Sequence, residues 1–128
     1  MKLTLSVREG RFAVCRLDPA GGLPEWATRG EIYSVTRAPG ELSVVCAEQD
    51  VPPGVACEAG WSCLGVHGPL DFALCGVLAS LTAPLADAGV AVFALSTHDT
   101  DYLLVKHGDL ERAVDALVRH GHAVVESG

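Results

Sequence analysis

The order of hydrophobic patterns between Trp61 and Val125 constrains the fold of this chain more than any other feature. Short apolar runs of strand length alternate there with two longer segments whose apolar residues recur every three or four positions, as on one face of a helix. The resulting order, strand-helix-strand-strand-helix-strand, is that of a ferredoxin-like α+β unit with helices on one face of an antiparallel sheet. We predict strands at 61–67, 90–95, 102–105 and 122–125, and helices at 70–88 and 110–120.

The first of these helices contains a proline that leaves two interpretations open. Pro84 would remove one internal hydrogen bond from a continuous helix, which would then be kinked there. Alternatively, the helix restarts with Thr82 as its N-cap and Pro84 in its first turn. In both cases Gly89 is placed to end the helix in a left-handed conformation. The predicted apolar face consists of Leu70, Leu74, Val77, Leu78, Leu81, Leu85 and Ala88.

The second helix carries polar residues at positions typical of an exposed helix. Asp115 and Arg119 are four residues apart, a spacing that favours an ion pair along the helix surface. Gly121 is placed to end this helix. It lies between His120 and His122, whose imidazoles we expect to interact with the exposed carbonyls of the last turn.

The first half of the chain lacks a long helical pattern. Apolar and polar residues alternate at 3–7 and again at 12–16, with Glu9-Gly10 between them, which predicts a β-hairpin. One helical turn fits at 23–28. Further strands are predicted at 32–36 and 42–47, and Pro52-Pro53-Gly54 marks a boundary.

A weak internal repeat indicates that the two halves are related. Shifting the sequence by 60 residues sets Val35-Thr36 against Leu95-Ser96, and 41–45 against 101–105. Because strand-turn-strand patterns are common, a chance match is the alternative. The predicted domains are a degenerate N-terminal unit at 1–54, with eroded helices, and a C-terminal unit at 55–128.

Composition and charge exclude several classes of partner. The chain has 128 residues, enough for one ordinary domain or two very small ones, and 49% of them are apolar, which favours a packed globule over disorder. Its formal net charge of −7 would repel nucleic acid and acidic membranes. No apolar run approaches the roughly 20 residues of a spanning helix, and no signal-peptide core follows Met1. We therefore expect a soluble, cytoplasmic protein.

The cysteines predict small buried side chains, with a metal or a reactive thiol as the less favoured alternative. An odd number of cysteines without a CxxC pair argues against a disulfide framework. Cys75 is the nearest candidate for a nucleophile, because it would lie near the start of the first helix, but its small and apolar neighbours favour a packing role. The five cysteines are Cys15, Cys46, Cys57, Cys63 and Cys75.

No catalytic or nucleotide-binding motif is present in the sequence, and we predict no enzymatic activity and no cofactor. His98, Asp99 and Asp101 could group around a metal ion. Three polar residues in one turn are more often solvated or capping groups, however, so we predict no metal site.

One pair of features indicates a binding site. The segment 67–71 joins a strand to a helix, so free backbone N–H groups and the positive end of the helix would be ready for a carboxylate. Asp101 would supply the complementary charge for an ammonium group. A small zwitterion could therefore bind here, most readily where two units meet. The alternative is that Gly68 and Pro69 only make a turn and that Asp101 only shields a strand end.

Several short segments of the sequence resemble those of a known family. They are 68–72, 76–79, 84–86, Ser96-Thr97, Asp101, Leu104-Val105 and, in the first half, 41–45. Together they are similar to the small bacterial ACT-domain proteins of the tandem type, which are related to the ACT modules of aspartate kinases and of the CASTOR arginine sensors. The similarity is strongest over 61–125 and weaker over 1–54. It implies two ACT units, pairing of chains into homodimers, and binding of an amino acid between units.

The resemblance also implies which residues contact the ligand. The arginine sensors have an acidic residue before the Cys-Gly pair of the first helix, whereas this chain has Leu74, so a smaller or more apolar amino acid is expected. The leading hypothesis is a non-catalytic regulatory protein that binds an amino acid. The alternatives are a protein-interaction module without a ligand, and an enzyme that uses Cys75 or the Asp99/Asp101 pair. The implied ligand residues are Gly68, Pro69, Leu70, Asp71, Ser96, Thr97 and Asp101, with the backbone of Ser43 and Val44.

Overall fold

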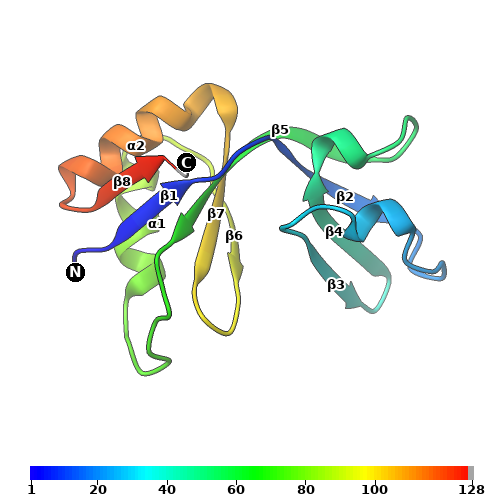
Figure 1. The fold of residues 1–128 in the computed structure, drawn as a ribbon, viewed down its shortest axis with the longest axis horizontal. Coiled ribbons are helices and arrows are strands. Elements are labelled where there is room, and N and C mark those ends of the chain that lie inside the picture. The colour runs from blue at the N-terminus through cyan, green and yellow to red at the C-terminus, as the bar shows by residue number, and fades with distance from the viewer. Residues whose placement is uncertain (127–128) are drawn as a thin grey trace. The chain divides into compact units, whose positions relative to one another are not determined.

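The chain divides into two compact units in a computed structural model that describes residues 1–126 (Figure 1). Unit 1 comprises Met1–Glu9 and Ser62–Gly128, and unit 2 comprises Gly10–Trp61. The first nine residues therefore group with the C-terminal half, whereas the predicted boundary between 54 and 55 placed them in the N-terminal domain. No helix among the described residues is long and apolar enough to cross a membrane.

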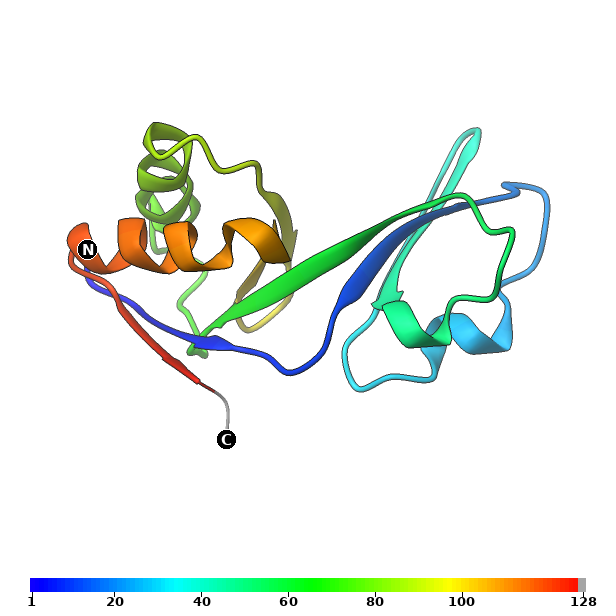
Figure 2. The same ribbon diagram turned by 90° about the horizontal axis from the view of Figure 1, so that it is seen from above.

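Unit 1 has the predicted ferredoxin-like order, β5-α1-β6-β7-α2-β8, preceded by one additional strand, β1. Within this unit the strands lie in the order β6-β7-β5-β1-β8, so β1 pairs antiparallel with β5 and parallel with β8. Both helices cover the same face of the sheet (Figure 2). The elements are β1 (Thr4–Val7), β5 (Cys57–Val66, of which Ser62 onward belongs to this unit), α1 (Val77–Asp87), β6 (Phe93–Ser96), β7 (Asp101–Lys106), the 3-10 turn η3 (His107–Asp109), α2 (Leu110–Arg119) and β8 (Ala123–Glu126).

Unit 2 has four strands arranged like β6, β7, β5 and β1 of unit 1, but it lacks the helices. Its strands lie in the order β3-β4-β2-β5, with every pair antiparallel. Two 3-10 turns stand where unit 1 has helices, and η2 follows β4 as η3 follows β7. The fold thus consists of two ferredoxin-like units, as predicted, and unit 2, the N-terminal one, is reduced. The elements of unit 2 are β2 (Phe12–Leu17), η1 (Glu25–Thr28), β3 (Ser34–Ala38), β4 (Glu41–Ala47), η2 (Glu48–Asp50) and the start of β5.

The core of unit 1 lies between the sheet and its two helices. Alternate residues of β5 and β7 face the helices, and side chains of α1 and α2 complete the cluster. The core residues are Leu5, Leu64, Val66, Val77, Leu81, Leu85, Val90, Leu103, Val105, Ala113 and Leu117. Unit 2 has a smaller core of Ala13, Cys15, Ala27, Val44 and Cys46.

The predicted hairpin between 3–7 and 12–16 is wrong. β1 pairs with β5 and β8, and β2 pairs with β4 and β5. Alternation of apolar and polar residues shows that a strand has one buried face, but it does not choose the partner strand. Here the ten-residue β5 offers a longer partner than either short strand offers the other.

The first helix begins later than predicted, at Val77 instead of 70. Gly76, with φ of 78°, lies just before the helix, and the Asp71 side chain accepts a hydrogen bond from the Ala73 N–H in a local turn. Leu70 and Leu74 therefore match the helical spacing without being helical. The other open question is answered by α1, which runs through Pro84 without restarting at Thr82.

A buried histidine compensates for the proline in α1. Pro84 has no N–H to donate to the Ser80 carbonyl four residues earlier. The Nε2 atom of His122 lies 3.0 Å from that oxygen, and its Nδ1 atom accepts a hydrogen bond of 3.0 Å from the Leu3 N–H. The proton must therefore be on Nε2. His122, 3% exposed, thus links α1 to the strand β1 instead of interacting with the carbonyls of its own helix, as the sequence had indicated.

The polar pattern of α2 is confirmed. Arg119 Nη2 lies 3.3 Å from Asp115 Oδ2, and Gly121 adopts φ of 102° after the last turn. Both side chains of the ion pair are largely exposed, so the pair adds only a few tenths of a kcal/mol, about 0.3–0.5. Gly121 marks the change of direction into β8.

Candidate functional site

Two hollows in unit 1 open beside the turn between β6 and β7. One, called here the Asp101 hollow, has a volume of about 370 Å³. The other, called the Arg8 pocket, has a volume of about 490 Å³. The turn residues Thr97, Asp99 and Thr100 line both. The Asp101 hollow is completed by Leu70, Asp71, Phe72, Leu74, Gly76, Val77, Leu78, Ser96, His98 and Asp101, and the Arg8 pocket by Ser6, Arg8, Gly65, Val66, His67, Gly68, Pro69 and Tyr102.

The β6–β7 turn is held by hydrogen bonds across the hairpin. Ser96 and Asp101 are direct partners in the strand register, and the Ser96 hydroxyl donates to Asp101 Oδ1 at 2.5 Å. The Thr97 N–H donates to the Thr100 carbonyl at 2.8 Å. Asp101 is 9% exposed, so the hairpin presents a nearly buried carboxylate to the Asp101 hollow.

The loop from Gly68 to Asp71 is joined to this turn. The Leu70 N–H donates to the Asp99 carbonyl at 2.6 Å, so it is not free for a ligand. A Cβ atom on Gly68 would lie 2.8 Å from the same carbonyl oxygen, closer than side chains approach backbone. The prediction that this loop offers the positive end of a helix is therefore wrong, because α1 starts only at Val77.

One side of the Asp101 hollow is apolar. Phe72 and Leu74 lie in the loop before α1 and are 76% and 46% exposed, and Leu78 follows in the first turn of the helix. The Phe72 ring packs edge-on against the His98 ring, with 4.9 Å between centroids. A nearly buried carboxylate beside exposed apolar side chains suits a small molecule that carries both a cationic group and an apolar part.

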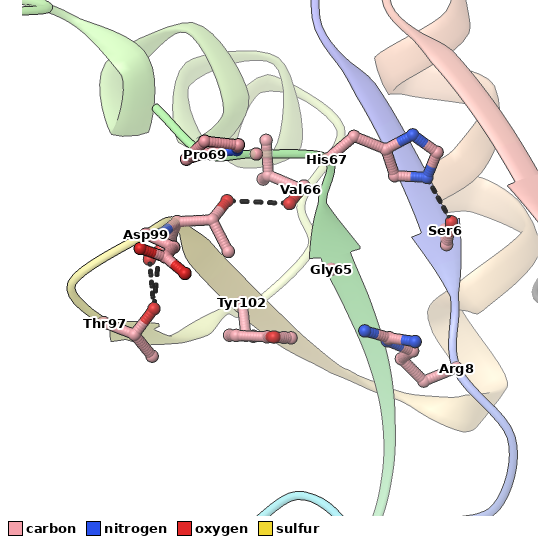
Figure 3. A pocket seen from close by; sticks show the side chains of 11 residues that line it. Ser6, Arg8, Gly65, Val66, His67, Pro69, Thr97, Asp99 and Tyr102 are labelled. Atoms are coloured by element: carbon pink, nitrogen blue, oxygen red, sulfur yellow. Dashed lines mark hydrogen bonds between the residues drawn. The ribbon is translucent and has the colours of Figure 1, made fainter. Parts of the chain in front are cut away.

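The Arg8 pocket has a different chemistry. Its arginine directly follows β1, and the guanidinium points toward Gly65 and Tyr102 (Figure 3). On another wall the Ser6 hydroxyl and His67 Nε2 are 2.5 Å apart. Sequence reasoning missed this pocket, because β1 was assigned to the N-terminal domain and so was not placed beside β5.

The structure brings seven of the nine predicted ligand residues together. Thr97 lines both hollows, and the other six divide between them, with Gly68 and Pro69 in the Arg8 pocket and Leu70, Asp71, Ser96 and Asp101 in the Asp101 hollow. Ser43 and Val44 belong to unit 2, on β4, which pairs with β2 and with β3. Val44 is fully buried. A part for these two residues in binding stays a prediction.

No group of His, Cys, Asp and Glu side chains within residues 1–126 has an arrangement that could hold a metal ion. In the turn considered above, His98 Nδ1 lies 2.9 Å from Asp99 Oδ1, and both side chains are exposed. Asp101, by contrast, faces Ser96. His98 and Asp99 thus pair with each other at the surface, and Asp101 has a different partner and is nearly buried.

The cysteines divide into buried and exposed thiols. Cys15, Cys46 and Cys63 are buried, as predicted, whereas Cys57 and Cys75 are exposed, so the predicted packing role is wrong for these two. Burial raises the pKa of the Cys15 thiol and of the Cys63 thiol to about 12, and raises the pKa of Cys46 as well. Cys75 precedes α1 and does not lie within it.

We expect a thiol reagent to modify two cysteines rapidly in the native protein and all five after denaturation. Cys57 and Cys75 are accessible to the reagent, whereas burial shields the other three thiols and suppresses their ionisation. Mass spectrometry after timed maleimide labelling measures this. Replacing Cys57 and Cys75 together by serine should remove the rapid phase, and rapid labelling that persists in this variant would contradict the prediction.

Two family models match this chain, each over a different part of it. A family model described as the ACT domain matches residues 56–119, half of the chain. A second model, of an N-terminal domain, matches residues 10–54. The second match falls within unit 2, and most of the first falls within unit 1.

Curated relatives of this chain include arginine sensors. The cytosolic arginine sensor for mTORC1 subunit 1 of Bos taurus is 31% identical over 103 residues, covering 72% of this chain and 31% of the sensor. The human sensor gives the same identity and coverage. The chain thus spans about a third of the length of these curated relatives.

Solved structures share the fold over nearly the whole chain. A crystal structure of an Agrobacterium tumefaciens protein has a TM-score of 0.94 and 35% identity, covering all of this chain and 96% of the other. The ligand-free regulatory subunit of aspartate kinase from Thermus thermophilus has a TM-score of 0.63 and 10% identity, covering 94% and 97%. The second likeness shows the fold alone.

Proposed function

Because the chain belongs to the ACT domain family, we propose that it is a non-catalytic regulatory protein that binds an amino acid or a similar small zwitterion. The name of its curated relatives, an arginine sensor, supports a regulatory role. The word cytosolic in that name supports a cytoplasmic location. Pairing of chains into homodimers stays a prediction. Binding of the amino acid would then be coupled to how the chains pack.

The observation that carries this proposal is the carboxylate of Asp101. It is 9% exposed, it lines a hollow, and it accepts a hydrogen bond from the neutral hydroxyl of Ser96. A nearly buried carboxylate is stabilised by a cationic partner, and the ammonium group of an amino acid can supply that charge. The ligand would then complete the charge balance of the hairpin.

The apolar wall of the Asp101 hollow bears on which amino acid binds. Phe72, Leu74 and Leu78 would surround the side chain of a ligand whose ammonium group lies on Asp101. These three residues offer no charge to a guanidinium. An amino acid with a small or apolar side chain is therefore the proposed ligand, and arginine, the ligand in the names of the curated relatives, is the main comparison.

Isothermal titration of the protein with each amino acid tests the function, and Asp101→Asn tests the site. Asparagine still offers an oxygen to the Ser96 hydroxyl but removes the negative charge, so we expect unchanged folding and affinity weakened by about tenfold or more. Asp115→Asn is the matched control, since Asp115 lies on the exposed face of α2.

One result would contradict the proposed function, and another would contradict the proposed site. If no amino acid at millimolar concentration binds or raises the melting temperature, the protein-interaction alternative is favoured; a ligand at 100 times its dissociation constant should add roughly 2.7 kcal/mol to stability. If an amino acid binds equally well to Asp101→Asn, the regulatory function stands but its site lies elsewhere.

A further inference from the structure

We propose that the Arg8 pocket is a second binding site, which takes the carboxylate or phosphate group of a small organic anion. The proposal does not depend on the Asp101 hollow or on its ligand. It rests on the placement of Arg8, on the absence of a partner for its guanidinium within residues 1–126, and on the shape of the surrounding wall.

The strand register places Arg8 on the sheet face opposite the helices. Leu5 and Leu64 point into the core, and side chains alternate along each strand, so Ser6, Arg8 and Gly65 share the other face. The Arg8 N–H donates to the Cys63 carbonyl at 2.8 Å, which fixes the end of β1 along β5. The arginine therefore projects from a defined position on paired strands.

The guanidinium of Arg8 has no hydrogen bond and no ion pair with any of the residues that the structure describes. The other arginines of unit 1 differ in this respect, because Arg112 is paired with Asp109 and Arg119 with Asp115. A guanidinium presents five donors in a planar fork that matches a carboxylate or a phosphate. An unpaired arginine in a pocket is thus equipped for an anion.

Gly65 shapes the floor between Arg8 and Tyr102. A Cβ atom at this position would lie 3.1 Å from the Tyr102 ring and 3.3 Å from Arg8 Nε. The absence of a side chain therefore lets both residues lie close to the strand and leaves the space above it open. Figure 3 shows the guanidinium and the aromatic ring on the two sides of Gly65.

The remaining wall is polar and suits a small, hydrated ligand. The Ser6 hydroxyl and the His67 ring lie on the side of β1, and Thr97 and Asp99 lie on the side of the β6–β7 turn. The volume of about 490 Å³ is in the range of small-molecule sites. The carboxylate of Asp99 would repel a ligand with several negative charges, so an anion of low charge is favoured.

Titration of the intact protein, followed by nuclear magnetic resonance, tests the pocket. The probes are acetate, succinate, glycine and inorganic phosphate, so that carboxylates and phosphate are compared directly. We expect at least one probe to cause saturable shifts at Gly65 and Tyr102 with a dissociation constant of a few millimolar or lower. In Arg8→Gln the affinity should fall by at least about tenfold, and Arg8→Lys should give an intermediate value.

Arg119→Gln is the matched control, and it should leave binding unchanged because Arg119 is already paired with Asp115. Equal affinity in Arg8→Gln, or no saturable shift with any of the four probes, would overturn the proposal. Asp101→Asn separates it from the proposed function. Anion binding that survives Asp101→Asn and fails in Arg8→Gln supports two separate sites, and loss in both variants would overturn the independence of the pocket.

Discussion

Replacing His122 by alanine is expected to lower the free energy of unfolding by about 2–4 kcal/mol. The imidazole satisfies two backbone groups at once, the Leu3 N–H and the Ser80 carbonyl. Alanine would leave both without their partner in a largely buried place, and each unsatisfied group costs about 1–3 kcal/mol. Urea unfolding followed by circular dichroism measures the change.

A double-mutant cycle with Pro84 tests this explanation. In Pro84→Ala, residue 84 regains an N–H that can donate to the Ser80 carbonyl within the helix. The cost of His122→Ala should therefore be smaller in the Pro84→Ala background, by about 1 kcal/mol. Additive effects would show that the two residues are not coupled. His120→Ala is the control, since His120 is exposed in the same segment and should change stability little.

Replacing Gly68 by alanine is expected to destabilise the protein by about 2–3 kcal/mol and to weaken ligand binding in both hollows. The new methyl group would lie 2.8 Å from the Asp99 carbonyl oxygen and 3.1 Å from Thr100 Cβ. Relief of this overlap must move the loop away from the β6–β7 turn, which would break the hydrogen bond from the Leu70 N–H. Chemical unfolding gives the loss of stability.

The matched control for this loop variant is Gly108→Ala. No atom lies within 4 Å of the Cβ that this change would add, so the effect of close approach is absent. We expect a change in stability within about 0.5 kcal/mol. If Gly68→Ala is as mild as Gly108→Ala, the close contact between the loop and the turn does not contribute to stability.

The fold of unit 1 could be predicted from sequence because its pattern is periodic over long segments. The order of elements from β5 to β8 followed from apolar spacing and from the turn residues between the segments. The start of α1 could not be predicted this way, since Leu70 and Leu74 match the helical spacing. The Asx turn at Asp71 and the left-handed Gly76 interrupt the helix there.

Only those residues of the candidate site that lie in two short loops could be predicted from the sequence. The β5–α1 loop and the β6–β7 turn are each short segments, and their residues do meet in the Asp101 hollow and the Arg8 pocket. Arg8 was not found because strand pairing across the chain decides its position. The register Ser6↔Gly65 joins residues 59 positions apart, and nothing in the pattern of either strand specifies the other.

The position of β1 has a consequence for how the protein can be made. Since β1 fills the place between β5 and β8, Leu5 is the direct neighbour of Val124, and unit 2 interrupts unit 1 as an insertion would. Synthesis of the chain must reach β8 before the sheet of unit 1 can close, and contacts so distant in sequence slow folding. A fragment limited to 56–119 would lack β1 and β8 and expose the hydrogen-bonding edge of β5.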